Sequence, residues 1–319
     1  MKVGLSLCPE VGRWSDTVAQ ARLATELGYD SVWLPEHHLM EAYSPSPMLG
    51  LAGLVELTGD LLLGTDIVVA PFHHPVRIAE EAAQLQDMSG GRFVLGLGLG
   101  YRPEEFAAFG VAFDDRASIF EEQLEVVGAL LKSTGVSFAG RHYLLDDVTI
   151  YPRPAPAPPI WVGGWVPRAV RRAARLADAW FPGPTATVAK VAACLDTYDA
   201  ELAALGDERD ELPIFREVWV ADNDADLSHG VERLEAMYSD DYVSWGHRNV
   251  QGAAEVRDDR FIVGDPEAVA QGIARLRDEL GATHLVARLH GHGVRQDHVE
   301  RAMRLLAGPV RDQLGVKSS

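Results

Sequence analysis

Short apolar runs alternate with longer amphipathic stretches along the whole of this 319-residue chain. The apolar runs expected to form strands are Lys2–Cys8, Ser31–Glu36, Leu61–Ala70, Phe93–Gly100, Ile160–Gly164, Ala179–Phe181, Ile214–Ala221 and His284–Leu289. The stretches expected to form helices are Ser15–Leu27, Leu49–Leu57, Pro75–Met88, Arg116–Ser133, Arg168–Ala177, Val188–Leu205, Pro266–Leu280 and Gln296–Leu306. This alternation favours an α/β fold, a single-domain (β/α)8 TIM barrel over residues 1–319, although doubly wound sheets share the pattern.

Two segments interrupt the alternation. Tyr151–Pro159 holds five prolines in nine residues, which excludes a helix interior or a central strand. It is either a linker between domains or, as we favour, a stiff connection within one barrel, because the alternation resumes at once. The second segment, Asp222–Arg260, lies between the seventh strand and the last long helix before the eighth. We expect an insertion there, either a surface excursion or a lid over the pocket.

Charge and cysteine content exclude several classes of function. The chain has 29 basic and 47 acidic residues, a net charge of −18, which would repel nucleic acid and anionic membranes. The two cysteines, Cys8 and Cys194, cannot form a disulfide framework. The N-terminus lacks the apolar core of a signal peptide, and no stretch is long enough to span a membrane. We therefore expect a cytoplasmic protein.

Polar residues follow the second and third expected strands, where a barrel of this kind places its chemistry. His37 and His38 come directly after the second strand and are suited to proton transfer, although structural histidines are an equal possibility. Asp66 stands among apolar residues of the third strand. If it is buried it must be paired or must face a ligand. His73 and His74 precede a helix and are expected to be structural.

Glycines mark the fourth and fifth strands. Gly96, Gly98 and Gly100 fall on one face of a strand, which indicates the approach of a flat ring or of a neighbouring backbone. Tight packing within the barrel explains them equally well. Gly163 and Gly164 end the fifth strand just before a helix, a geometry that can hold a phosphate on free amide groups. The side chain of Arg168 would add a charge-assisted contact there.

A metal site is not expected. His290 and His292 form a His-x-His pair after the eighth strand, but barrel hydrolases with such pairs need bridging carboxylates or lysines at other strand ends. A Gly-x-Ser-x-Gly nucleophile motif is also absent from the sequence.

Three groups of motifs resemble the bacterial luciferase-like family of flavin- and deazaflavin-dependent oxidoreductases. The matching segments are Trp33–His38, His74–Glu81 with Leu85–Phe93 and Tyr101–Phe106, and Trp161–Gly164 with Ala173–Trp180. The resemblance covers residues 1–180 well and 264–289 loosely. It implies a (β/α)8 barrel that holds reduced FMN or the deazaflavin F420 at its open face.

The resemblance also implies roles for single residues. His37 matches the histidine that is catalytic in luciferases, and His38 is its neighbour. Thr65, Asp66 and Ile67 would lie against the isoalloxazine ring, with a cis peptide bond expected between Asp66 and Ile67. Gly163 and Gly164 match the phosphate region. A homodimer is implied by the family.

We therefore expect a monooxygenase that takes reduced FMN from a separate reductase and uses O2 to oxygenate a small organic substrate. The alternatives are F420-dependent hydride transfer, a non-catalytic flavin-binding or partner subunit, and a metal-dependent hydrolase. The luciferase cysteine and arginine of the fourth strand are replaced here by Gly98 and Leu99, which argues against oxidation of long-chain aldehydes. Candidate residues for a substrate pocket are Trp14, Phe72, Trp245 and His290.

Overall fold

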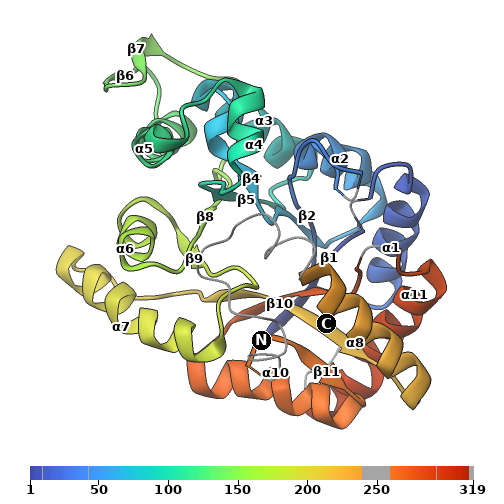
Figure 1. Cartoon of the computed structure of the whole chain (residues 1–319). Coiled ribbons are helices and arrows are strands. Elements are labelled where there is room, and N and C mark those ends of the chain that lie inside the picture. Colours follow the sequence, from blue (N-terminus) through green and yellow to red (C-terminus); the bar gives the residue numbers. More distant parts are fainter. Residues whose placement is uncertain (9, 42, 239–258, 292, 316–319) are drawn as a thin grey trace.

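A computed structural model describes residues 1–8, 10–41, 43–238, 259–291 and 293–315, in which parallel strands curl around a centre with helices outside (Figure 1). The strands are β1 (Lys2–Ser6), β2 (Ser31–Leu34), β3 (Leu62–Thr65), β4 (Val68–Val69), β5 (Phe93–Gly98), β8 (Ile160–Gly163), β9 (Ala179–Phe181), β10 (Pro213–Val220), β11 (Ile262–Gly264) and β12 (His284–Arg288). Their hydrogen-bonded order is β11-β10-β12-β1-β2-β3-β5-β8-β9, with β4 paired to β5. This confirms the barrel class and all eight expected strands.

Two details of the sheet differ from the prediction. The third strand is divided into β3 and β4 around Asp66 and Ile67, whose peptide bond is cis as expected. The short strand β11 adds to the edge of β10. Between β9 and β10 the backbone amide of Phe215 donates to the carbonyl of Pro182 over 3.4 Å, so the two ends of the curled sheet approach each other.

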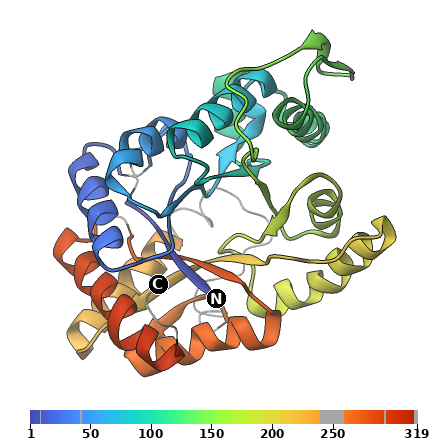
Figure 2. The same ribbon diagram turned by 180° about the vertical axis from the view of Figure 1, so that it is seen from behind.

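Helices surround the curled sheet, as the view from behind also shows (Figure 2). Their bounds are α1 (Trp14–Glu26), α2 (Pro47–Leu54), α3 (Pro75–Met88), α4 (Pro103–Phe109), α5 (Arg116–Lys132), α6 (Pro167–Leu176), α7 (Val188–Leu205), α8 (Asp224–Tyr238), α10 (Pro266–Leu280), α11 (Gln296–Leu305) and α12 (Arg311–Leu314). Helix α4, helix α12 and the hairpin of β6 (Val136–Ala139) and β7 (Leu144–Val148) were not predicted. Among the described helices none is long and apolar enough to cross a membrane.

Both interrupting segments can now be placed in part. The proline-rich segment runs from β7 to β8, and the carbonyl of Pro156 accepts a hydrogen bond from Gln86 Nε2 on α3 at 3.0 Å. It therefore lies along the barrel wall. The expected insertion Asp222–Arg260 begins with helix α8, which packs on β10 and β11. Residues 239–258, including Trp245, lie outside the described residues.

Large side chains fill the interior of the barrel below its open end. Trp33 stacks on Trp161 with ring centroids 5.0 Å apart, and Phe181 packs against both. Phe215 and Val286 complete this interior cluster from the opposite strands. Among the described residues, this packed floor lies below a pocket at the carboxyl ends of the strands.

The glycines of β5 allow the divided third strand to approach closely. A Cβ atom on Gly96 would stand 1.9 Å from the carbonyl oxygen of Thr65, and one on Gly98 would stand 2.2 Å from Cδ1 of Ile67. The Thr65 hydroxyl also donates to the carbonyl of Gly96 over 2.8 Å. Tight barrel packing, one of the two alternatives, therefore accounts for Gly96 and contributes at Gly98.

This packing predicts that Gly98→Ala destabilises the protein by about 1–3 kcal/mol, because the new methyl group must displace Ile67. Gly128→Ala is a matched control, since a Cβ atom on this glycine of α5 meets nothing within 4 Å. The control should gain about 0.5–1 kcal/mol from helix propensity. Urea unfolding of both variants measures the difference, and equal stabilities would contradict the packing account.

Candidate functional site

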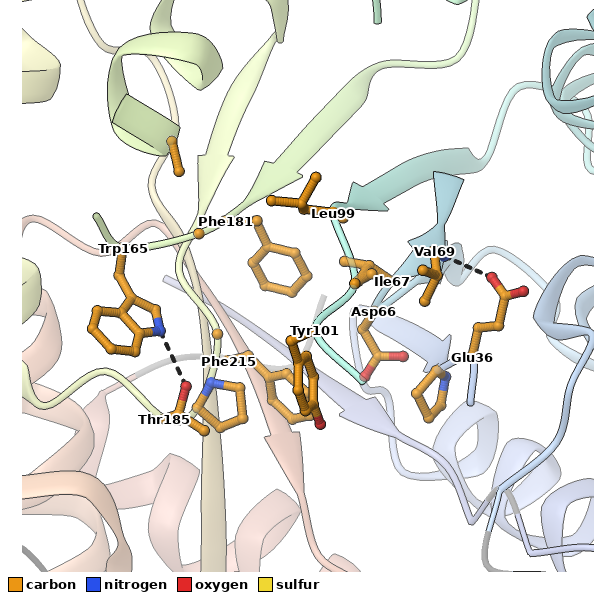
Figure 3. Close-up of a pocket in the computed structure, with 18 of the residues that line it drawn as sticks. Glu36, Asp66, Ile67, Val69, Leu99, Tyr101, Trp165, Phe181, Thr185 and Phe215 are labelled. Carbon is orange, nitrogen blue, oxygen red and sulfur yellow. Dashed lines mark hydrogen bonds between the residues drawn. The ribbon is translucent and has the colours of Figure 1, made fainter. Parts of the chain in front are cut away.

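A pocket of about 290 Å³ opens at the carboxyl ends of the strands. Its walls are apolar for much of their area, with Ile67, Val69, Leu99, Phe181 and Phe215 facing the space (Figure 3). Asp66 and Glu36 lie on one side of the view, and Trp165 and Thr185 lie on the other. An apolar slot with polar groups at opposite ends suits a flat, amphipathic ligand.

The Trp165 end is built from the turn between β8 and α6. A Cβ atom on Gly163 would have no neighbour closer than 3.7 Å, so the backbone here borders open pocket space. Gly164 has a φ of +127°, and its Cβ position lies 2.7 Å from Cβ of Ala169. Val166 supplies no side-chain cap to α6. The turn and the helix start therefore form a cradle able to hold an anion.

Arg172 adds a positive charge to this cradle. It lines the pocket from α6, is only 2% exposed, and lies over the ring of Phe120 at 5.4 Å. Burial lowers its pKa, but arginine still keeps its proton near neutral pH. A buried arginine on the helix that begins at this turn is well suited to a phosphate group.

A buried carboxylate organises the residues that follow β2. Glu36 is 2% exposed, and its Oε1 lies 2.7 Å from Nε2 of both His38 and His73. Its Oε2 accepts a hydrogen bond from the amide of Val69 at 2.6 Å (Figure 3). Burial opposes ionisation of Glu36, but the hydrogen bonds from the two histidines outweigh it and lower its pKa.

These contacts give His38 and His73 structural positions. Burial alone would lower the pKa of His73, but the bond to Glu36 outweighs it and raises that pKa. Glu36, His38 and His73 also form a group of metal-ligand type, with the three ligand atoms within 4.8 Å of one another. The two histidines already form hydrogen bonds with the Glu36 carboxylate.

His37 is the histidine that reaches the pocket. Its Nδ1 lies 3.5 Å from Oε1 of Glu105 on α4, and its ring meets Tyr43 and Tyr101 edge-on at 4.7 and 5.9 Å. Arg102 donates to the same oxygen of Glu105 over 2.8 Å. Burial opposes the charge of Glu105, but the nearby His37 and Arg102 lower its pKa. An imidazole held against a carboxylate can exchange protons with a ligand.

Asp66 stands at the break between β3 and β4 and is 6% exposed. Burial raises its pKa to about 7, against smaller opposing effects from Ser6 and Arg288. From the sequence we expected that Asp66, if buried, would either be paired or face a ligand. Neither carboxyl oxygen has a hydrogen-bond partner among the described residues, and the side chain lines the pocket.

The structure brings together only part of the predicted site. The predicted residues that line the pocket are His37, Asp66, Ile67, Gly98, Gly100, Gly163 and Gly164. The predicted residues that are not among its lining residues are Trp14, His38, Thr65, Phe72, Arg168 and His290. Trp245 lies outside the described residues.

The predicted residues that do not line the pocket have other contacts. Arg168 extends from α6 toward Glu121, at 3.7 Å, with 72% of its side chain exposed, so its charge points away from the cradle. Trp14 covers Gly53 on α2, where a Cβ atom would meet its ring at 3.1 Å. Phe72 stacks on Phe109 with centroids 4.7 Å apart.

The other predicted residues that do not line the pocket are buried. The Thr65 hydroxyl is engaged by Gly96, and His38 is engaged by Glu36. His290 is 5% exposed and lies beyond the end of β12. In each case the strand-end position was right, but the side chain turned into the protein rather than toward the pocket.

Several lining residues that sequence reasoning did not assign to the site come from loops, helices and strands. Among them are Tyr43, Tyr101 and Thr185 in loops, Glu105 and Arg172 on helices, and Phe215 and Arg288 on β10 and β12. Arg172 gave one usable signal, since it follows Arg168 by one helical turn and so lies on nearly the same face of α6. The loop residues carry no periodic signal that could have placed them.

Comparisons with known proteins agree with this geometry. The model of the luciferase-like monooxygenase family matches residues 1–284. An F420-dependent glucose-6-phosphate dehydrogenase of Microbacterium testaceum is 30% identical over 297 residues, covering 86% of this chain and 87% of that protein. Two uncharacterised proteins of Sinorhizobium fredii match over about half of their own length, 46% and 48%.

Two solved structures share the fold over nearly the whole chain. The monooxygenase RslO1 of Streptomyces bottropensis has a TM-score of 0.82 at 26% identity, covering 98% of this chain and 99% of that one. The oxygenating constituent of 3,6-diketocamphane monooxygenase of Pseudomonas putida, in complex with FMN, has a TM-score of 0.82 at 19% identity, covering 98% of both chains. Similar proteins thus include F420- and FMN-dependent enzymes.

Proposed function

This chain is a member of the luciferase-like monooxygenase family, and we propose that it oxygenates a small organic substrate with O2 and reduced FMN supplied by a separate reductase. The observation that carries the proposal is the cradle of Gly163, Gly164 and Arg172 at one end of an apolar slot. A phosphate in the cradle would leave the ring system in the slot, against Ile67. The proposal includes a homodimer, which follows from the family and is tested by mass measurement in solution.

Reduced FMN, when bound, supplies the chemistry by activating O2 and passing one oxygen atom to the substrate while the other leaves as water. The protein binds and orients the ring, and the apolar walls of Leu99, Phe181 and Phe215 keep water away from it. His37 faces the same space, braced by Glu105, and holds or releases a proton at an imidazole nitrogen.

The charges of the described pocket favour FMN over F420. Arg172 and Arg288 are the cations among the lining residues, and Arg288 is paired with Glu217 at 2.6 Å. One available cation matches the single phosphate of FMN, whereas F420 carries a longer anionic tail. F420-dependent hydride transfer is the second candidate, favoured by the 30% identity to the Microbacterium testaceum dehydrogenase.

The cradle predicts that Gly163→Ala weakens FMN binding about 10- to 100-fold, which corresponds to ~1.4–2.8 kcal/mol. The new methyl group would occupy pocket space without a steric clash, since its nearest neighbours lie at the ordinary van der Waals distance of 3.7 Å. The melting temperature without ligand should therefore stay unchanged. Fluorescence titration with FMN measures the affinity, and unaltered binding would remove the cradle from the site.

The proposed reaction is tested by mixing the anaerobic complex of protein and reduced FMN with oxygenated buffer. Flavin absorbance and hydrogen peroxide are followed over time. A pocket that excludes water should delay peroxide release relative to free reduced FMN. If hydrogen peroxide is released as fast as from free reduced FMN, and F420 binds tightly, the proposal of a monooxygenase is wrong and F420-dependent hydride transfer takes its place.

A further inference from the structure

The carboxyl group of Asp66 is buried in the pocket wall. Its side chain is 6% exposed, and both oxygens lack partners among the described residues. Asp66 and Ile67 are adjacent and both line the slot (Figure 3). An ionised carboxylate in such a place is costly, whereas a protonated carboxyl is far cheaper to bury.

The groups that face Asp66 do little to keep it ionised. Ser6 at the end of β1 has a buried hydroxyl that lowers the pKa of Asp66, but by less than burial raises it. Arg288 on β12 attracts the carboxylate, but Arg288 Nη2 is held by Glu217 Oε1 at 2.6 Å, which offsets its charge. Burial therefore dominates, in agreement with a pKa of about 7 for Asp66.

The remaining charged groups of this side of the pocket are engaged with one another. Glu36 is bonded to two histidines, and Glu105 is bonded to Arg102 while lying close to His37. Tyr43 lies near the edge of His37 and 3.4 Å from Nη1 of Arg288. None of these contacts reaches the oxygens of Asp66, so its proton is not shared with the network around Glu36.

We infer that Asp66 is a catalytic acid–base residue of this pocket, holding a proton that it can exchange with a molecule bound against Ile67. In the transfer the carboxyl O–H bond breaks and a new bond forms between that proton and an acceptor atom of the ligand. The electron pair stays on the carboxylate, which later takes a proton back from solvent. The inference rests on the proposed function for the identity of the ligand, but not for the state of the carboxyl group.

Infrared difference spectra of the ligand-free protein between pH 5 and pH 9 (about two pH units either side of the midpoint) test the carboxyl group directly. The wild type should show a protonated-carboxyl C=O band that disappears with a midpoint near pH 7, and Asp66→Asn should lack it. Asp226→Asn is the matched control, a buried carboxylate 2.7 Å from His298 Nδ1, and should keep the band. A missing band in the wild type, or one that persists in Asp66→Asn, overturns the inference.

Proton exchange on ligand binding tests the transfer. Wild type and Asp66→Asn are titrated with oxidised FMN, and separately with F420, in weak buffer at neutral pH containing an indicator dye. Both proteins should bind. The number of protons taken up or released on binding should differ between them, because only the wild type can exchange the proton of Asp66. Equal exchange in the two proteins overturns the inference. If the wild type binds neither of these molecules and does not bind reduced FMN either, the proposed function fails, and the infrared band alone decides whether Asp66 holds its proton.

Discussion

Glu36→Gln should lower the free energy of unfolding by about 3–5 kcal/mol, because it breaks a buried, charged network. The carboxylate accepts hydrogen bonds from His38, His73 and the amide of Val69. A glutamine keeps only one oxygen, so its amide group must face at least one of these donors. Urea unfolding measures the loss, which is large against the stability of an ordinary domain.

A surface glutamate provides the control for this variant. Glu81 pairs with Arg77 at 2.6 Å, one turn away on α3, and the Arg77 side chain is 68% exposed. Glu81→Gln should change stability by less than about 0.5 kcal/mol. Comparable losses in the two variants would mean that the network around Glu36 contributes little, and would contradict the account of the second strand end.

The same network fixes a pH dependence. The pKa of Glu36 is lowered from 4.5 in the folded protein, so its contribution is present above pH 4.5 and is lost as the pH falls through the folded value. The pKa of His73 is raised from 6.5, so its contribution is present below pH 6.5 and is lost as the pH rises through the folded value. In Glu36→Gln the free energy of unfolding should therefore depend less on pH, both on the acidic side, where Glu36 titrates, and on the basic side, where His73 titrates.

His37→Ala should lower turnover by about 10²–10⁴-fold if this imidazole is the acid or base toward the substrate. His37 faces the pocket, and Glu105 braces it at 3.5 Å. Flavin affinity should change far less than turnover, because the cradle for the phosphate lies at the other end of the slot. Steady-state kinetics and a binding titration on the same preparation separate the two effects.

His142→Ala is the control for the loss of an imidazole. His142 lies in the turn of the β6–β7 hairpin, with its Nε2 2.9 Å from the hydroxyl of Ser118, and is not among the residues lining the pocket. It should leave turnover unchanged. Undiminished turnover in His37→Ala, with flavin still bound, would remove His37 from the mechanism and leave Asp66 as the remaining candidate for proton transfer.

Much of the fold was predictable because local signals agreed with the tertiary structure. Helices α7 and α10 were predicted to the residue. Their N-caps, Thr187 and Asp265, each accept a backbone amide, and glycines with φ of +79° and +71° end them. Helix α4 was missed because Pro103–Phe109 is short and follows a loop, yet it supplies Glu105 to the site.

The site was less predictable than the fold, since strand order fixes where a residue lies but not where its side chain turns. His37 and His38 are neighbours, yet one reaches the pocket and the other bonds to Glu36. Arg168 and Arg172 share a helix, yet one is exposed and the other buried. Residues from loops, such as Tyr101, joined the wall through contacts that no periodicity encodes.

We propose that the pocket holds a reduced flavin with its phosphate in the cradle of α6. Anaerobic titration of the purified protein with FMN, reduced FMN and F420, followed by absorbance and fluorescence, tests this proposal. We expect reduced FMN to bind tightest and Gly163→Ala to weaken this binding. Preference for F420 would contradict the monooxygenase, and binding of none of the three would contradict the site itself.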